Sequence, residues 1–479
     1  MAASSFQNNW GSEIKIEIPE TGLTFGELDK LLRDKLGHAS HVSGEVVRTA
    51  AGISLTARLG DAPPQTFEGP QSAIDAIAQQ AAEAIYRSSQ PYRFSQYLEQ
   101  HGRVPEAFAV IADLAANGPQ SERGWAYSQW ATLDVNDHGD LPAARTHGLQ
   151  ALAESAGAMV EAEIVMVAVE VWSGHDEQAL GYSKDLAVKS QIRAPEQTKA
   201  FVDANRLIAT AWLDSLVGNS RRSADTYLAV EKQPGYPSIQ KLAPALVATG
   251  YALDHDLAAA RAAIALKSPV DDTPFLEDDA LDAFSAAPVY WIAAEAGNWP
   301  AALASARAMD AWVDANKPAR PLLGLMQPVW IHPLEALAMA RAGDLAGAQA
   351  LIATTPADCY LCLRVRGQIA AQGKDWATAQ RWFAEAVRQA PSLPFAYADW
   401  GRVKLAMGDA DGAIAKFELA HLKSPNFADP LELWGEALLR KGDFAGAAAK
   451  FAEADEYAPH WARNHQMWRR ALAGAKTHG

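Results

Sequence analysis

The C-terminal third of the chain repeats one pattern of apolar, small and turn-forming residues at a fixed interval of 34 positions. Each interval holds two stretches with apolar residues at helical spacing, separated by a turn that ends in aspartate and closed by a proline. Six register positions recur: Gly367, Gly401 and Gly435; Asp375, Asp409 and Asp443; Ala379, Ala413 and Ala447; Phe383, Phe417 and Phe451; Ala386, Ala420 and Ala454; Pro391, Pro425 and Pro459. This register predicts a helical hairpin that stacks on copies of itself.

The middle repeat illustrates the expected role of each position. Gly401 lies where two helices must approach closely, and Phe417 fills the space between neighbouring repeats. Gly408 is expected to end the first helix in the left-handed conformation, and Asp409 to cap the second helix. Pro425 cannot continue a helix and therefore ends the unit. The tryptophans that share a further register position are expected to fill the core: Trp400, Trp434 and Trp468.

This motif resembles the tetratricopeptide repeat (TPR) family over residues 359–470. The resemblance implies a right-handed helical solenoid with a concave face, where extended peptides or partner segments dock. It also implies which positions of the first helix in each repeat line that face: Arg364, Gln368, Phe395, Arg402, Glu432, Glu436, Arg463 and Arg470. The lysine and asparagine clamp with which chaperone adaptors hold a C-terminal carboxylate is not present.

Arg364 and Arg402, on the first helices of adjacent repeats, suggest an acidic partner. Arginine pairs with carboxylates through a planar fork, so both residues are expected to contact successive points of one ligand. Because neither belongs to the packing set, replacing both with glutamate is expected to leave the fold intact. The alternative is a groove whose charged residues are solvated or paired with one another.

Turn signals recur earlier in the chain at longer and less regular intervals. They are Gly102-Arg103, Gly139-Asp140, Gly174-His175, Gly218-Asn219, His255-Asp256, Gly297-Asn298 and Gly343-Asp344. Alanine-bearing amphipathic stretches follow them, which is typical of degenerate repeats. We therefore expect a mainly α fold, a TPR-like α-solenoid of about ten helical hairpins. Degenerate hairpins would occupy residues 89–357, and regular 34-residue units residues 358–475.

The N-terminal segment has a different pattern and predicts a small α+β module over residues 13–88. Residues 13–18 alternate polar and apolar as a strand, and a capping box at Thr24 opens a helix. Residues 42–48 and 53–59 read as a hairpin, with a short third strand near Phe67. A second helix is expected over 71–87, which makes the order β-α-β-β-(β)-α.

The charge balance excludes some classes of partner. A formal net charge of −15 argues against nucleic-acid binding and against electrostatic docking on anionic lipid. No apolar run approaches the length of a membrane span, and the N-terminus lacks an apolar signal region. We expect a cytoplasmic protein if the chain is complete, and a periplasmic one if a membrane anchor has been removed.

The only cysteines, Cys359 and Cys362, stand at the expected start of a repeat's first helix. Thiol oxidoreductases use this spacing at a helix N-terminus, where the thiol pKa is lowered, but the βαβ context of a thioredoxin-like fold is missing. A disulfide, a redox-active pair and two small core thiols are the alternatives. Two cysteines alone cannot build a tetrahedral structural zinc site.

Other candidate chemistry is sparse. The acidic loop over 268–279 lacks the ligand spacing of a calcium loop, so it is interpreted as a solvated loop. No phosphate-binding loop, zinc-protease motif, nucleophile elbow or dinucleotide fingerprint occurs. The sequence predicts no catalytic residue, no metal and no cofactor.

A wider resemblance concerns the last 120 residues, with Asp358–Arg364, Pro391–Gly401 and Phe427–Gly435. They are similar to the TPR-rich region of bacterial membrane-anchored signalling proteins that carry a Toll/interleukin-1-receptor or nucleotide-cyclase domain. The resemblance implies a sensory or scaffolding repeat domain. The leading hypothesis is a non-enzymatic scaffold with a protein or peptide partner, and the alternative is a thiol-redox protein acting through the cysteine pair.

Overall fold

The structure is a computed structural model and describes residues 42–50, 52–154, 159–189, 199–230, 237–266 and 278–478. Contacts divide the chain into two compact units. The first reaches Trp130 and includes Leu149–Ala162, and the second holds Ala131–Gly148 and Glu163–Gly479. Several predicted segments lie outside the described residues: the strand over 13–18, the helix opening at 24, the loop over 190–198 and most of the loop over 268–279.

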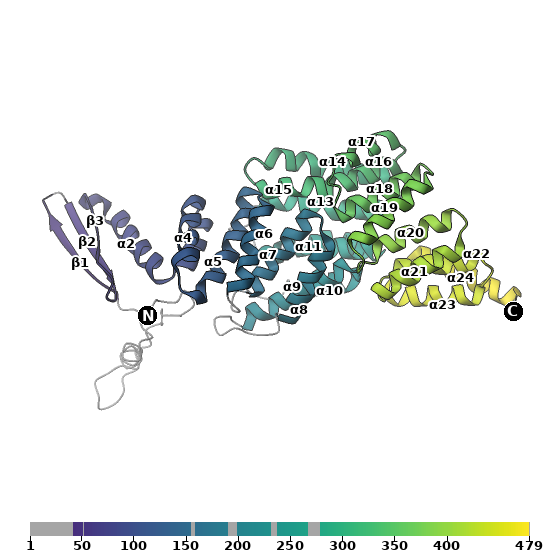
Figure 1. The fold of residues 1–479 in the computed structure, drawn as a ribbon, viewed down its shortest axis with the longest axis horizontal. Coiled ribbons are helices and arrows are strands. Elements are labelled where there is room, and N and C mark those ends of the chain that lie inside the picture. Colours follow the sequence, from purple (N-terminus) through teal and green to yellow (C-terminus); the bar gives the residue numbers. More distant parts are fainter. Residues whose placement is uncertain are drawn as a thin grey trace, which may run out of the picture. The chain divides into compact units, whose positions relative to one another are not determined.

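The first unit contains a three-stranded antiparallel sheet in the order β1-β2-β3 (Figure 1). Its strands are β1 Val42–Thr49, β2 Gly52–Leu59 and β3 Gln65–Gly69. Thr49 pairs with Gly52 in the tight hairpin, and Leu55 lies opposite Phe67 on the other edge of β2. These pairings confirm the predicted hairpin and the third strand.

Helices complete this unit. They are α2 Ile74–Ser89, α3 Pro91–Gln100 and α4 Val104–Asn117, with a 3-10 turn over Gln71–Ala73 before α2. Helix α2 packs on β2 and β3 and buries Ile77 and Ala81, which confirms the predicted second helix of the module. Arg103, in the turn of the α3–α4 hairpin, donates to Glu83 of α2 at 2.8 Å and ties the hairpin to the module.

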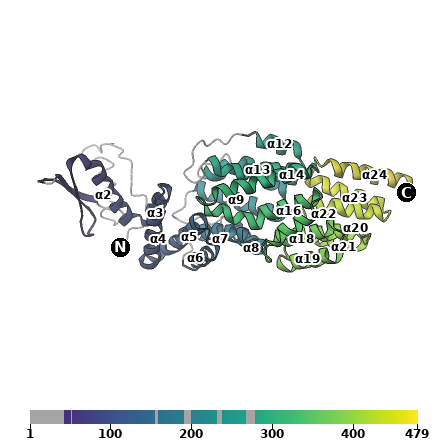
Figure 2. The same cartoon turned by 90° about the horizontal axis from the view of Figure 1, so that it is seen from above.

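The boundary between the units passes through three helices, α5 Gln120–Leu133, α6 Leu141–Glu154 and α7 Met159–Ser173. The other helices of the second unit form a continuous series of hairpins, which makes the fold a TPR-like α-solenoid with a small N-terminal sheet region (Figures 1 and 2). They are α8 Asp176–Lys189, α9 Lys199–Leu216, α10 Ser220–Val230, α11 Pro237–Leu253, α12 Leu257–Ile264, α13 Asp278–Glu295, α14 Trp299–Asn316, α15 Pro321–Met326, α16 His332–Arg341, α17 Leu345–Ala353, α18 Tyr360–Gln372, α19 Trp376–Gln389, α20 Phe395–Ala406, α21 Ala410–Lys423, α22 Ala428–Arg440, α23 Phe444–Tyr457 and α24 Ala462–His478.

The predicted turns are confirmed by their backbone geometry. A left-handed residue ends the first helix at each predicted turn: Gly102, Gly139, Gly174, Gly218, His255, Gly297, Gly343 and Gly408. At several of these turns an aspartate then caps the next helix: the Asp409 carboxylate accepts from the Gly412 amide at 2.9 Å and the Asp256 carboxylate from the Ala259 amide at 3.0 Å. The degenerate hairpins therefore share the local design of the regular ones.

Close helix approach at the glycine register is also confirmed. A Cβ atom added to Gly401 would lie 2.4 Å from the Phe417 ring. A Cβ atom added to Gly367 would lie 2.6 Å from the Phe383 ring, and one added to Gly435 would lie 2.7 Å from the Phe451 ring. All three phenylalanines are fully buried. Only glycine permits this packing, because real Cβ contacts are longer.

One feature of the second unit has no counterpart in the sequence pattern. Turns of the degenerate hairpins dock onto the first residues of helices in the regular repeats, about two hundred positions later. The Gly174 carbonyl accepts from the Tyr360 amide at 2.8 Å, and Gly218 lies against the rings of Phe427 and Phe395. His255 stacks on Trp461 with ring centroids 3.6 Å apart. In Figure 2, α8 lies beside α18, in keeping with the first of these contacts.

Candidate functional site

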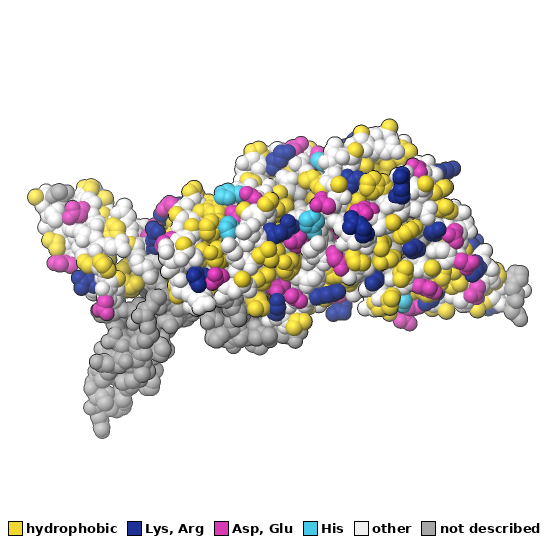
Figure 3. All heavy atoms as spheres, in the orientation of Figure 1, with side chains coloured by type: hydrophobic (Ala, Val, Ile, Leu, Met, Phe, Trp, Pro, Cys, Tyr) yellow, Lys and Arg dark blue, Asp and Glu magenta, His cyan; other side chains and the backbone are white. Residues whose placement is uncertain are grey.

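The eight residues predicted to line a groove lie on four successive first helices, α18, α20, α22 and α24. Neighbouring helices of this series pack on one another, as do α16 and α18. Basic and acidic side chains interleave over the visible face of the solenoid in Figure 3. Whether a given charge is available to a partner therefore depends on its neighbours.

Arg364 and Phe395 are brought together, but within the protein. The Arg364 guanidinium donates from Nε to Asp399 at 2.8 Å and lies 4.8 Å from the centroid of the Phe395 ring. Its side chain is 18% exposed, and that of Asp399 is 9% exposed. Burial disfavours the charged guanidinium, yet the Asp399 carboxylate outweighs it and raises the pKa of Arg364. Arg364 therefore differs from the sequence expectation, because its charge is matched internally.

Glu432 also departs from the sequence expectation. It is fully buried, so it does not line an open face. Burial raises the pKa of Glu432 to about 7, against the attraction of Arg463. Arg463 forms ion pairs with both Glu432 and Glu436, and Glu436 accepts from Arg440 at 2.6 Å as well. The structure thus gathers three of the predicted groove residues into one internal network.

Arg402 and Gln368 remain open to a partner. Arg402 is exposed and forms no ion pair in the part of the chain that the structure describes, although its charge helps to lower the pKa of Asp429. Gln368 is half-buried on α18. Arg470 is exposed, and its guanidinium lies 3.8 Å from the Met467 sulfur.

Arg341 is a further residue of the candidate site, and the sequence pattern did not predict it. It interacts electrostatically with Arg402. Burial lowers the pKa of Arg341, and the nearby positive charge of Arg402 lowers it further. Its Nε is buried without a hydrogen-bond partner, while its Nη1 donates to Gln372 only at 3.5 Å. Arg341 ends α16, before the strict register begins, so periodicity alone could not mark it. An arginine in the last turn of a first helix was the available signal.

His255 lies within an internal cluster of charged and aromatic side chains, one of which, Asp429, also interacts electrostatically with Arg402. His255 lies 2.9 Å from Glu295 and 3.0 Å from Asp429 and is stacked on Trp461. Burial alone would lower the pKa of His255, but the two carboxylates raise it to about 10. The ring therefore carries a positive charge at neutral pH and joins a degenerate turn to α13, α22 and the start of α24.

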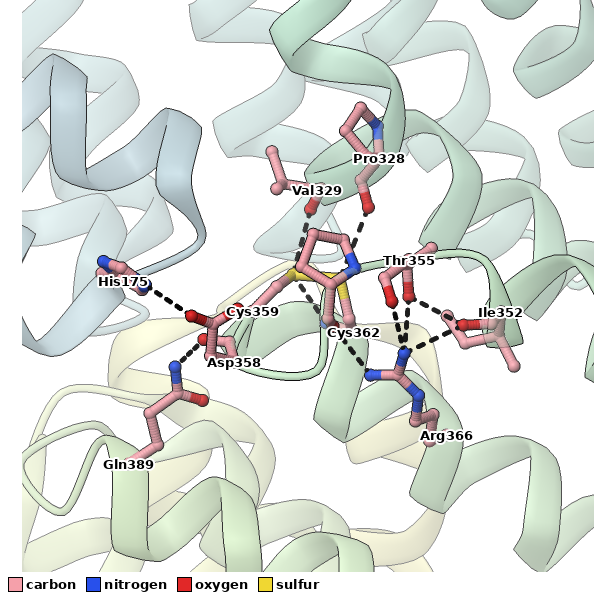
Figure 4. The surroundings of a disulfide bond; sticks show 11 residues. His175, Pro328, Val329, Ile352, Thr355, Asp358, Cys359, Cys362, Arg366 and Gln389 are labelled. Carbon is pink, nitrogen blue, oxygen red and sulfur yellow. Dashed lines mark hydrogen bonds and ion pairs between the residues drawn. A yellow bond between two sulfur atoms is a disulfide. The ribbon is translucent and has the colours of Figure 1, made fainter. Parts of the chain in front are cut away.

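The cysteine pair lies in a docking contact (Figure 4). Cys359 and Cys362 form a disulfide, and both residues are fully buried. The Cys362 amide donates to the Cys359 sulfur at 3.2 Å, so the pair caps α18. A Cβ atom on Gly174 would lie 2.6 Å from the Cys359 Cβ, while His175 lies 3.3 Å from Asp358. A working thiol pair needs an accessible sulfur, which this arrangement lacks.

The residues that the structure describes offer neither a metal-binding cluster nor a membrane-spanning helix. No group of three or more His, Cys, Asp or Glu side chains suited to a metal ion occurs in those ranges. None of the helices described combines the length and apolar character that crossing a bilayer requires.

Comparison with known proteins gives distant structural likenesses. No protein-family model matches the chain, and neither does any curated protein. It is similar to a chain of the APC/C hetero-tetramer Cut9–Hcn1, with 12% identity over 84% of this chain and 82% of that chain, at a TM-score of 0.40. A tetratricopeptide repeat protein from Parabacteroides merdae ATCC 43184 shares 13% identity over 56% of this chain and 98% of that chain, at 0.34. The TPR2AB domain of yeast Sti1 in its pHSP90 complex shares 14% identity over the same proportions, at 0.23.

Proposed function

We propose that this chain is a non-catalytic protein-interaction scaffold that binds an acidic segment of a partner along α16, α18 and α20. The observation that carries this proposal is the pair Arg341 and Arg402. Burial and the positive charge of Arg402 lower the pKa of Arg341, against the attraction of Asp399, and Arg402 has no ion-paired carboxylate among the described residues. Asp399, whose charge acts on Arg341, is already bound to Arg364.

The chemistry of such a site favours carboxylates. Arginine donates two parallel hydrogen bonds to one carboxylate, and a half-buried arginine loses less of the gain to solvent screening than an exposed one. A carboxylate placed between the two groups would remove their mutual repulsion. Gln368, on the helix between them, supplies a neutral hydrogen-bonding group for the partner backbone.

The setting of this scaffold is a further part of the proposal. The resemblance of the regular repeats to membrane-anchored bacterial signalling proteins suggests a sensory or assembly system. The thiol-redox alternative gains no support from the geometry, because both sulfurs are buried and bonded to each other.

The test starts from peptides selected on the full chain from a random display library. We expect the enriched peptides to be acidic, and Arg402→Glu to weaken them by about 1–3 kcal/mol in calorimetry, since the site is partly exposed. Arg381→Glu is the matched control, because Arg381 is exposed on the second helix α19 and donates to Thr378 of the same helix at 2.9 Å. Enrichment without acidic residues, or equal losses in both variants, would contradict the proposal.

A further inference from the structure

Helix α24 carries an unbalanced positive charge. Residues Ala462–His478 include Arg463, Arg469, Arg470 and Lys476 and contain no aspartate or glutamate, in a chain with a net charge of −15. Arg463 is committed to the buried network with Glu432. The other three are exposed, and none of them meets a carboxylate among the described residues.

The same helix carries an open hollow of about 310 Å³, lined by His465, Trp468, Arg469 and Leu472. These positions follow the i, i+3, i+4, i+7 spacing of one helix face, and Lys476 continues the stripe by one more turn. Leu472 is 45% exposed. His465 is held from the side by Asp455, at 2.6 Å. Trp468 is half-buried and packs in part against the core cluster that contains Phe451, whereas Leu472 and the cations of the stripe are exposed.

The regular repeats show what normally covers this stripe. Trp468 stands in register with Trp400 and Trp434. The Lys416 ammonium lies 3.5 Å from the centroid of the Trp400 ring, and that of Lys450 lies 4.1 Å from the Trp434 ring. In each case a lysine from the following second helix covers the indole by a cation–π contact.

A repeat-type helix cannot cover Trp468 in the same way. Arg469 occupies the register of Gly401 and Gly435, where even a Cβ atom would lie 2.4–2.7 Å from the phenylalanine of the second helix. The long side chain of Arg469 stands where that phenylalanine would pack. The stripe therefore suits a different occupant, which brings an apolar group for Trp468 and a negative charge for Arg469.

We propose that α24 is a second docking surface, separate from the Arg341–Arg402 site, for an acidic amphipathic segment of another protein. One large apolar side chain of the segment would lie on Trp468 and Leu472. Carboxylates about one helical turn to either side would pair with Arg469 and Lys476, which are two turns apart in the stripe. The charge complementarity between three unmatched cations and an acidic segment selects this occupant.

The probe is a short synthetic helix with one phenylalanine flanked by glutamates, labelled for fluorescence anisotropy and titrated with the full chain. Two matched peptides separate the contributions: one with glutamines in place of the glutamates, and one with serine in place of phenylalanine. We expect the parent peptide to bind most tightly, and binding to weaken as salt rises from low to physiological ionic strength.

Variants of the chain locate the site. Arg469→Glu and Leu472→Ser should each weaken the parent peptide about tenfold or more, whereas Arg381→Glu should change it less than about twofold. Unchanged thermal unfolding of the two α24 variants is expected, since both residues are exposed. Equal loss in all three variants, or no binding of the parent peptide, would overturn the assignment.

Three further outcomes would also overturn it. A concentration-dependent dimer in light scattering that Leu472→Ser abolishes would identify a second copy as the occupant. Phosphatidylserine vesicles that bind in an Arg469-dependent manner, without peptide binding, would identify a lipid surface. Equal affinity of the parent and serine peptides would show charge attraction without the apolar anchor.

Discussion

The imidazole ring of His255 lies flat on the indole ring of Trp461, with the centroids 3.6 Å apart and the planes 9° from parallel. His255 sits in a left-handed turn of a degenerate hairpin, with φ of 62°, and Trp461 immediately precedes α24. Trp461 shares its register with Cys359 and Phe427. The turn at Gly174 packs against Cys359, and the turn at Gly218 packs against Phe427. The second unit is therefore held by three contacts of one kind, rather than by neighbouring repeats alone.

Replacing His255 with glutamine should destabilise the second unit by about 2–3 kcal/mol, because it leaves the carboxylates of Glu295 and Asp429 without their cation. The measurement is urea unfolding followed by circular dichroism. Replacing His101, which is bonded only within its own helix end at Tyr97, gives the control and should change little. A His255 variant as stable as the parent chain would mean that the contact contributes nothing to the stability of the second unit.

The stability provided by His255 should depend on pH in a defined direction. Asp429 and Glu295 raise the pKa of His255 to about 10, against the effect of burial, from an ordinary value of 6.5. A raised pKa in the folded state means that the contribution is complete below about pH 6.5 and is lost as the pH rises through about 10. We expect the difference in unfolding free energy between the parent chain and the glutamine variant to shrink between about pH 7 and pH 10.5. A difference that stays constant would show that the ring is not charged at neutral pH.

Gly401→Ala should destabilise the chain by about 1–3 kcal/mol, because the new methyl group must enter the space of the Phe417 ring. Gly181→Ala is the matched control. Gly181 lies within α8 with no atom within 4 Å of an added Cβ, so the same change there should stabilise by about 0.5–1 kcal/mol. Thermal unfolding of both variants tests the pair, and a shift of the same sign in each would be inconsistent with close packing at Gly401.

The cysteine pair should resist chemistry in the folded state. Both sulfurs are buried against Pro328 and Val329, so a reductant and a thiol-labelling reagent should modify them only in denaturant. The loop that the disulfide closes is very short, so the bond constrains the unfolded chain little, and Cys359→Ser with Cys362→Ser should lower stability by about 2 kcal/mol or less. Mass spectrometry after labelling reads the outcome. Rapid labelling of the native chain, or insulin reduction that depends on Cys359, would revive the thiol-redox alternative.

The predictable parts of the fold are those with a local signature. Gly401 and Phe417 repeat every 34 residues, so their contact could be inferred from the sequence. The docking of Gly174 on Cys359 could not, since it joins residues 185 positions apart with no periodic signal.

In the candidate site, Asp399 follows Arg364 by one repeat and one residue. An opposite charge at that offset was a signal that Arg364 is neutralised inside the protein. The sequence could not predict which arginines are available to a partner, because that depends on the burial of each side chain, and neighbouring helices set this burial.

Arg364 and Arg402 should therefore respond in opposite ways to charge reversal. Arg364→Glu places a second carboxylate beside Asp399, which is 9% exposed, and should destabilise the chain by about 3–5 kcal/mol. This differs from the sequence expectation that both replacements leave the fold intact. Arg402→Glu should leave thermal unfolding nearly unchanged, since Arg402 is exposed and forms no ion pair among the described residues, and should weaken only the acidic peptides enriched from the display library.

Restoring stability to Arg364→Glu by Asp399→Arg would assign the loss to this one pair. If both single variants melt with the parent chain, the Arg364–Asp399 contact is not needed for the fold, and Arg364 returns as a candidate for binding.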